Sequence, residues 1–558
     1  MSQKVSFNLV DEPWVRIRDE AGEVRELSLL ELFEQAPHIK CLANDLPTLD
    51  FAILRVTLAV LPRAISRSLD EEDDPADVWS RLWAASEFPL EEIREYLDEW
   101  HDRFDLFDDR HPFMQVADLR MGKDEVSDVK KIIADVPDGD PLFSLRAGKG
   151  AESLSYSEAA RWLIHVQAFD TSGIKSGTIG DPRVKGGKSY PIGTGWAGSL
   201  GCLFFEGSSL FETIMLNFIV CGNDKSDLFS EDDLPCWERS VANFGTDNRT
   251  PTGRLDLYTW QSRRVRLVPG NDRVIGVVLT NGDKLESRNM DHCEPMTAWR
   301  RSEAQEKKLK LPLVYLPRFH RSDRALWRGL DSVFGDGLKE EKASILRSNL
   351  EEWVSYLASN NGGRCLDQRC LLEIHAIGFE YGTQNSIITN SIDDKITLSA
   401  FLLSNEGESL VAHAKECVSE TSEAIMALGN FAANLCKASG GSGASEINGA
   451  RQGTTAQAYF EIDAPFRAWL ADLNANSNVE VEIDRWRRTA RSIIKANAFS
   501  LMQGLSPNAI VGAPVKGVAG RNAGWMTASR AEAIFYAQLK KSLPLEEDDI
   551  KEEKEVRS

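Results

Sequence analysis

The pattern of hydrophobic positions changes once along the chain, near residue 400. Before that point, short alternating or apolar runs are interrupted by Gly, Pro, Asn and Asp, which is typical of mixed strands, helices and loops. After it, apolar or small residues recur every three or four positions from Leu410 to Leu435, which predicts an amphipathic helix of about seven turns. Similar spacing predicts helices over 454–473, 479–504 and 526–543, and four successive helices favour an up-down bundle.

We therefore predict an α+β chain with three parts. Residues 1–400 should form a mixed α/β domain with β-hairpins, and residues 401–545 a four-helix bundle. Residues 546–558 form a charged tail that offers nothing to a core and is expected to be disordered.

Within residues 1–400 the pattern predicts individual elements and loops. The region from about 115 to 200 is rich in glycine and proline, so it is the best candidate for functional loops on a scaffold. The other predicted elements are a strand over Phe7–Ile17, helices over Leu27–Phe33 and Leu49–Leu69, hairpins in 255–285 broken at Pro269-Gly270 and Asn281-Gly282, and a strand pair, Leu371–Phe379 and Ile387–Leu398, around Gly382.

The charge is acidic as a whole but basic in one window. The chain has 558 residues and a net charge of −21, so it should not coat a nucleic acid by bulk charge. Residues 257–330 nevertheless hold fifteen Lys and Arg against eight Asp and Glu. This window could contact phosphates locally, or its charges could pair with acidic neighbours on a solvated face. A second basic stretch, between Arg485 and Lys495, favours a solvated helix face over a binding site.

The sequence offers no positive sign of catalysis or metal binding. Nine scattered cysteines contain no C-x-x-C pair, the eight histidines never cluster, and no nucleophile motif is present. We expect no cofactor and no metal, and a protein that is not an enzyme. No signal core and no apolar stretch of about 18 residues occurs, so we expect a cytoplasmic protein with no membrane partner.

Several short motifs resemble one family in the same order along almost the whole chain. They are Asn8-Leu-Val-Asp-Glu-Pro-Trp-Val15, His111-Pro-Phe-Met-Gln115, Tyr258-Thr-Trp-Gln261, Gly382-Thr-Gln-Asn-Ser-Ile387 and Ala537-Gln-Leu-Lys-Lys-Ser-Leu-Pro544. The chain thereby resembles the CasA-type large subunit of the type I-E CRISPR surveillance complex, Cascade. The order of these motifs, the chain length and the terminal helices together make the resemblance fairly specific.

The resemblance implies a function and a set of partners. Such a subunit recognises the protospacer-adjacent motif in double-stranded DNA through the minor groove and starts strand separation for R-loop formation. It also helps recruit the helicase-nuclease, and it works with crRNA and the other Cascade subunits. Guide pairing reads the remaining target, a division of labour also seen in another effector class.

The resemblance also places a glycine-rich loop beside the DNA minor groove. Gly186, Gly187, Lys188 and Ser189 match that loop. Glycine lets the backbone approach base edges, and Lys188 could add a phosphate contact. Gly193-Thr-Gly-Trp196 is the alternative register, and a plain connection between two strands is the alternative interpretation.

A β-hairpin wedge is the second implied element, and Gln384 and Asn385 occupy its tip. A rigid hairpin can push a side chain between base pairs, and the glutamine amide can replace some base hydrogen bonds. An ordinary turn is the alternative, because Asn and Ser are common turn residues.

The remaining implied contacts are less well placed in the sequence. Phe143, Arg146 and Lys149 resemble a loop that contacts crRNA or a neighbouring subunit, although Phe143 could equally be a core residue. Lys284 and Arg288 are candidates for a lysine near the motif DNA. Two rival functions remain: a structural scaffold whose basic window binds protein, and a hydrolase with a dispersed active site.

Overall fold

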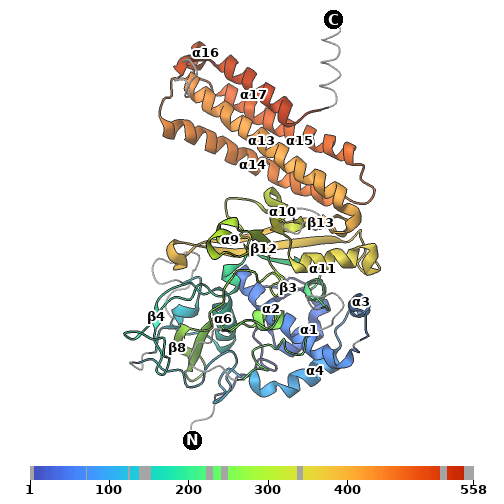
Figure 1. The fold of residues 1–558 in the computed structure, drawn as a ribbon, viewed down its shortest axis with the longest axis vertical. Coiled ribbons are helices and arrows are strands. Elements are labelled where there is room, and N and C mark those ends of the chain that lie inside the picture. The colour runs from blue at the N-terminus through green and yellow to red at the C-terminus, as the bar shows by residue number, and fades with distance from the viewer. Residues whose placement is uncertain are drawn as a thin grey trace. The chain divides into compact units, whose positions relative to one another are not determined.

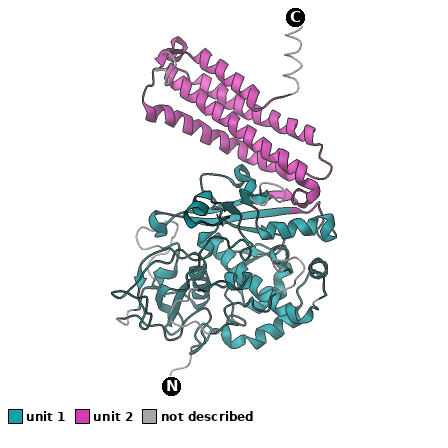
Figure 2. Ribbon diagram, viewed as in Figure 1, with its two compact units in different colours: residues 1–367, 372–396 teal, residues 368–371, 397–558 magenta. Residues whose placement is uncertain are grey.

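The structure is a computed structural model that describes residues 5–70, 72–122, 126–136, 152–221, 230–240, 249–335, 343–515 and 524–545. Phe143, Arg146 and Lys149, and the predicted tail 546–558, lie outside these residues. The described part combines helices with small sheets and has a helical C-terminal part, so the predicted fold class is confirmed (Figure 1). The chain divides into one compact unit of residues 1–367 and 372–396, and a second of 368–371 and 397–558 (Figure 2).

The first unit is built around an apolar helix, α2. The helix spans Pro47–Ile65 and is buried on almost every face, because α4, α6, α7 and α8 all pack against it. A helix that is hydrophobic all round belongs inside a core rather than at a surface. The helices of this unit are α1 (Leu29–Gln35), α2, α3 (Pro75–Ala85), α4 (Leu90–Glu99), α6 (Tyr156–Phe169), α7 (Leu210–Asn217), α8 (Arg254–Tyr258), α9 (Glu303–Leu309), α10 (Asp331–Phe334) and α11 (Asn349–Ala358).

Small antiparallel sheets carry the loops of this unit. Their strand orders are β2-β1-β3, β10-β9-β11 and β13-β12-β6, with the two-stranded pairs β4-β5 and β7-β8. The strands are β1 (Val15–Asp19), β2 (Val24–Leu27), β3 (Ile39–Leu42), β4 (Lys175–Ser176), β5 (Lys188–Ser189), β6 (Cys202–Glu206), β7 (Arg263–Pro269), β8 (Val274–Asn281), β9 (Trp299–Arg301), β10 (Tyr315–Pro317), β11 (Ile345–Leu346), β12 (Leu371–Tyr381) and β13 (Ile388–Ser399).

The second unit is a helical bundle centred on α13, which packs against α14, α15 and α17. Its core is aromatic: Trp486 on α15 is fully buried, donates to the Thr421 hydroxyl of α13 at 2.9 Å, and meets Phe466 of α14 edge-on. The elements are α12 (Ala400–Leu403), α13 (Glu408–Ala438), α14 (Ala444–Asp472), α15 (Val479–Gln503), α16 (Pro507–Val511), β14 (Ala513–Val515), β15 (Gly524–Met526) and α17 (Ala528–Ser542).

Two local predictions are wrong. The strand expected from Phe7 begins only at Val15, because residues 8–12 form a turn in which the Glu12 N–H donates to the Asn8 carbonyl at 2.8 Å. The turn expected at Asn281-Gly282 is absent, since Asn281 ends β8. The break expected at Pro269-Gly270 is confirmed, because β7 and β8 pair across a turn in which the Gly270 N–H donates to the Arg273 carbonyl at 2.6 Å.

Candidate nucleic-acid interface

Residues 185–188 form an exposed two-residue hairpin turn. The backbones of Lys185 and Lys188 exchange two hydrogen bonds of 3.1 Å, and the two glycines between them have positive φ, 59° at Gly186 and 74° at Gly187. Positive φ at both central positions is what a type I′ turn requires, and glycine adopts it without steric cost. A Cβ built on either glycine meets no atom within 4 Å, so both glycines face open space.

The glycine hairpin, residues 175–189, is anchored at its base to strand β8. The Thr280 hydroxyl donates to the Ser176 carbonyl at 2.8 Å, and the Asn281 amide donates to the carbonyl of Tyr190 at 2.8 Å and to the Ser189 hydroxyl at 3.2 Å. Ser189 is 7% exposed. Its side chain therefore faces the protein, and the structure does not bring it to the exposed turn with Gly186, Gly187 and Lys188.

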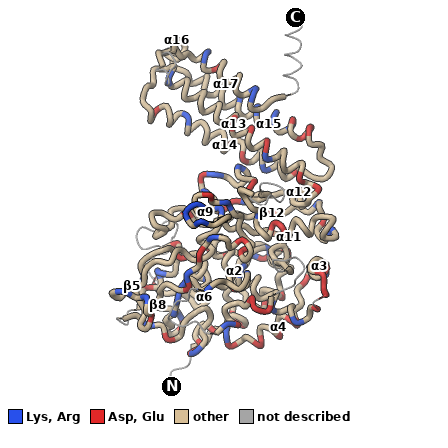
Figure 3. The backbone as a smooth tube through the Cα atoms, viewed as in Figure 1, with Lys and Arg blue, Asp and Glu red and all other residues tan. Residues whose placement is uncertain are grey.

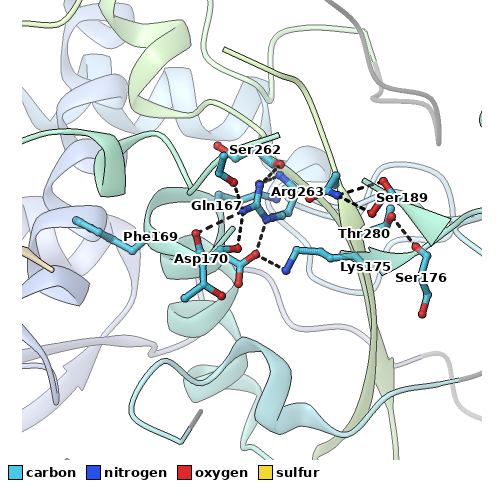
Figure 4. A network of polar contacts seen from close by, with 12 residues as sticks. Gln167, Phe169, Asp170, Lys175, Ser176, Ser189, Ser262, Arg263 and Thr280 are labelled. Atoms are coloured by element: carbon cyan, nitrogen blue, oxygen red, sulfur yellow. Dashed lines mark hydrogen bonds and ion pairs between the residues drawn. The ribbon is translucent and has the colours of Figure 1, made fainter. Parts of the chain in front are cut away.

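A buried carboxylate organises the segment that enters the hairpin (Figure 4). Asp170, just after α6, contacts both the Arg263 guanidinium and the Lys175 ammonium, the latter at 2.6 Å. Burial alone would raise the pKa of Asp170, but the two cations outweigh it and hold that pKa below its usual value. The Arg263 side chain also donates to the carbonyl oxygens of Thr171 and Gly193, which fixes the chain on both sides of the hairpin.

The second exposed turn joins β12 to β13 at residues 382–387. The Gly382 N–H donates to the Ile387 carbonyl at 2.8 Å and closes the turn, while Gln384 and Asn385 are exposed at its tip. Both tip residues have a φ of 56°. Asn tolerates this left-handed conformation, whereas it costs a residue such as Gln on the order of 1–2 kcal/mol. Strain held at an exposed tip is consistent with a functional position.

Direct hydrogen bonds tie the β12–β13 hairpin to the segment that enters the glycine hairpin. The Ser172 N–H donates to the Asn385 carbonyl at 2.8 Å, and the Tyr381 hydroxyl donates to the Phe169 carbonyl, also at 2.8 Å. Ser172 lies between Asp170 and Lys175, the two residues that anchor the glycine hairpin. The structure thus brings the predicted glycine loop and the predicted wedge onto one segment, residues 169–176.

A charged cluster fastens the base of the β12–β13 hairpin. His375 on β12 contacts Asp393 on β13 at 2.5 Å, and its other ring nitrogen lies 3.5 Å from Glu206 on β6. Lys395 contacts Glu206 at 2.5 Å and Glu373 at 2.9 Å. Burial lowers the pKa of His375, but Asp393 and Glu206 outweigh it and hold the pKa above its usual value. His375 therefore links three strands, and its two carboxylate neighbours favour its protonated form.

The other candidates differ in their placement. Lys284 is exposed and follows Asn281 by three residues, a span of at most roughly 11 Å, so it lies at the end of β8 that holds the glycine hairpin. Arg288 is half-exposed and paired with Glu286 at 2.5 Å. The alternative run 193–196 is packed inside only in its second half, where a Cβ on Gly195 would lie 2.4 Å from the Ala168 backbone and Trp196 is 4% exposed. Gly193 has a φ of 112°, and a Cβ built on it meets no atom within 4 Å.

The basic window does not form one continuous surface, which corrects part of the sequence interpretation. Arg263 and Arg264 are buried, and their charges are neutralised by Asp170 and by Asp283, the latter at 2.6 Å. Arg301 is paired with Glu306 at 2.8 Å. Exposed positive charge of the window gathers on and next to α9, whereas α3 and its approach are acidic (Figure 3). In the second unit, Arg487 and Arg488 pair with Glu420 and Asp484, as expected of a solvated helix face.

Sequence reasoning missed the residues that position the two turns. Asp170, Ser172 and Lys175 carry no motif, and their partners Arg263 and Asn385 are remote in sequence. Among the described residues, no group of three or more His, Cys, Asp or Glu side chains is placed to hold a metal ion. Of the helices in the described ranges, none combines the length and apolarity needed to cross a membrane.

Known proteins are similar to this chain in both sequence and fold. The family model of CRISPR-associated protein Cse1 matches residues 8–496. CRISPR-associated protein CasA/Cse1 of Thermus thermophilus is 30% identical over 341 residues, 60% of this chain; the match spans only 61% of that relative's length.

Solved structures extend the similarity over nearly the whole chain. The structure of Thermobifida fusca Cse1 is 39% identical, covers 97% of this chain and 98% of its own, and superposes with a TM-score of 0.84. A chain from a CRISPR RNA-guided surveillance complex is 17% identical, covers 96% of this chain and 99% of its own, and has a TM-score of 0.68, which shows a shared fold.

Proposed function

The chain belongs to the CRISPR-associated protein Cse1 family, and from that premise we propose that it is the large subunit of a type I-E Cascade complex that recognises the protospacer-adjacent motif of target DNA. Its partners are then crRNA, the other Cascade subunits, the double-stranded target and a helicase-nuclease recruited after R-loop formation. The fold shared with a chain of a CRISPR RNA-guided surveillance complex supports this assignment.

The proposal rests on two exposed turns, the Gly186-Gly187 turn and the Gln384-Asn385 tip, which are linked through the segment 169–176. In the proposed complex, the Gly186-Gly187 turn lies against the minor groove, where absent side chains allow the backbone to approach base edges. The minor groove distinguishes bases poorly, which suits recognition of several related motifs. Lys188 and Lys284 supply phosphate contacts, and these position the duplex without reading its sequence.

The Gln384-Asn385 tip acts in this proposal as the wedge that starts strand separation. The tip projects from two paired strands, and the Ser172–Asn385 hydrogen bond keeps it in a fixed relation to the glycine hairpin. Insertion of a side chain between base pairs costs a few kcal/mol of stacking, which new contacts offset. The Gln384 amide offers both a donor and an acceptor to the separated bases. The proposed role includes no catalytic step, so the subunit acts by binding alone. Its proposed place of action is the cytoplasm.

A scaffold subunit that does not touch DNA is the second candidate. It is favoured by the internal pairing of Arg263 and Arg264, which removes two charges from the basic window. The two candidates differ in one measurable property, the dependence of target binding on the motif.

The test uses the complex assembled with crRNA, with and without this chain. Binding is measured to duplexes that share one protospacer and differ only in the flanking motif. We expect motif-dependent binding only when the chain is present. Equal motif dependence without the chain would overturn the proposal and leave the scaffold role, and cleavage of DNA by the isolated chain with a divalent metal would contradict its non-catalytic part.

A further inference from the structure

A cavity lies beside the β12–β13 turn and the segment that enters the glycine hairpin, and the function proposed above does not use it. Its volume is about 300 Å³, it opens to solvent, and it is lined by residues 130–134, 165–166, 169–176, Leu279 and 386–388. It therefore lies between the segment that enters the glycine hairpin and the strand that leaves the wedge tip. Sites for small organic molecules begin at about this size.

The cavity is apolar at its sides and cationic at one edge. Ile174 and Ile387 line it and are 58% and 51% exposed, which is unusual for isoleucine in a folded chain. Lys130 and Lys131 lie on the 3-10 turn Val129–Ile132 at its edge, and Lys175 reaches into the wall, where it pairs with Asp170. Burial lowers the pKa of Lys175, and the Asp170 carboxylate opposes that shift. Because Asp170 pairs with both Lys175 and Arg263, the exposed positive charge at this edge is that of Lys131.

Serine hydroxyls add hydrogen-bonding capacity beside these apolar walls. Ser172, Ser176 and Ser386 all line the cavity. A nucleotide consists of a planar apolar ring, hydrogen-bonding edges and a phosphate. The isoleucine walls match the ring, the serine hydroxyls match the edges, and the lysines match the phosphate. An acidic peptide would use the lysines and leave the isoleucines exposed, so a nucleotide fits the set better.

We propose that this cavity receives one unpaired nucleotide of the duplex that the wedge opens. The inference rests on the proposed function, because only an opened duplex supplies an unpaired base next to Gln384. Extruding a base costs least when its pair is already broken, so a cavity adjoining the wedge tip captures it at the least cost. Occupancy would then oppose reannealing and stabilise the open state.

Gly173 offers a way to fill the cavity without disturbing the fold. It lines the cavity, its φ is not in the left-handed range, and a Cβ built on it meets no atom within 4 Å. Gly173→Leu therefore occupies space while leaving the Ser172–Asn385 bond in place. Gly453→Leu, at an exposed site on α14 with equally open surroundings, is the matched control.

The experiment places 2-aminopurine singly at the first positions of each target strand beside the motif, in the full complex with crRNA. We expect the fluorescence of 2-aminopurine to rise at one position, because the base there is unstacked. We also expect that fluorescence to be protected from quenching by acrylamide. Gly173→Leu should abolish that protection with strand opening retained, Lys131→Glu should weaken it several-fold, and Gly453→Leu should leave it unchanged. Protection that survives Gly173→Leu at every position would overturn the inference.

A second target, with a pre-formed bubble at the same positions, separates this inference from the proposed function. If the duplex stays closed but a base of the bubble is protected, the wedge assignment fails and the cavity assignment stands. If the bubble binds with no protected base on either strand, the cavity assignment fails whatever the wedge does.

Discussion

The backbone N–H of Ser172 donates a 2.8 Å hydrogen bond to the carbonyl oxygen of Asn385, and it joins two residues that are 213 positions apart in the chain. Asn385 stands at the wedge tip and Ser172 on the segment that enters the glycine hairpin. Because both partners are backbone groups, side-chain substitutions at either turn can test function without breaking the connection.

Gln384→Gly should stabilise the protein and weaken strand opening. Glycine adopts a φ of 56° without cost, so the unfolding free energy should rise by up to about 1 kcal/mol. The lost amide should reduce opening at the first base pair more than it reduces initial docking. Thermal unfolding gives the first quantity and 2-aminopurine fluorescence the second; unchanged opening would remove Gln384 from the wedge.

Gly186→Asn should keep the backbone conformation of the turn while it hinders the close approach of the turn to DNA. Asn tolerates positive φ and is favoured at this position of type I′ turns, so the hairpin should keep its conformation and its melting temperature. Its side chain would nevertheless project into the open space on the DNA side. We expect motif-dependent binding to fall about tenfold, which is about 1.4 kcal/mol. Wild-type binding in a folded variant would show that no DNA approaches this turn.

Lys188→Glu should weaken target binding and flatten its salt dependence. One lost phosphate contact reduces the slope of log K against log salt by about 0.9. Arg81→Glu makes the same charge change at a 65% exposed side chain in the acidic α3 region and serves as the control. The measurement is target affinity at several salt concentrations, and an equal effect of both variants would indicate bulk charge rather than a local contact.

Asp170→Asn should destabilise the first unit strongly. It leaves the buried Arg263 and Lys175 without their shared counter-charge, a change that typically costs about 3–5 kcal/mol. Asp45→Asn breaks an exposed pair with Arg16 and should cost less than about 1 kcal/mol. Denaturant unfolding of both variants tests the difference; similar small losses would mean that Asp170 does not anchor the hairpin.

The contribution of His375 should fall as pH rises. Its folded-state pKa lies above the ordinary value of 6.5, so its stabilising effect is complete below pH 6.5 and is lost as pH rises through the folded pKa. Glu206, Glu373, Asp393, Lys395 and Asp50 are the charged groups around it. Unfolding free energies of wild type and His375→Gln, measured from pH 5.5 to pH 8.5, should converge at high pH. A constant difference would exclude a protonated clamp.

Patterns among neighbouring residues predicted those helices and turns that depend mainly on neighbouring residues. The three-and-four spacing from Leu410 to Leu435 anticipated α13, and the family resemblance read from short motifs is confirmed by the Cse1 family model. The Gly382 turn was also found from neighbouring residues, because turn geometry depends on a few consecutive φ values, whereas the Gly186-Gly187 loop was identified through the family resemblance.

Long-range pairing could not be read in the same way. Arg263 looked like surface charge because its partner Asp170 lies 93 residues earlier, and only the fold brings the two together. Asn8 and Glu12 interrupted a strand that alternation alone had extended to Phe7. Charge counts in a window therefore overestimated the exposed positive surface.

The most direct measurement is the structure of the complete complex bound to target DNA that carries its motif. We expect the backbone of Gly186 and Gly187 to lie within about 4 Å of the motif's minor groove. This arrangement also places Gln384 at the first separated base pair. A duplex that runs elsewhere, with both turns facing solvent or another subunit, would contradict it.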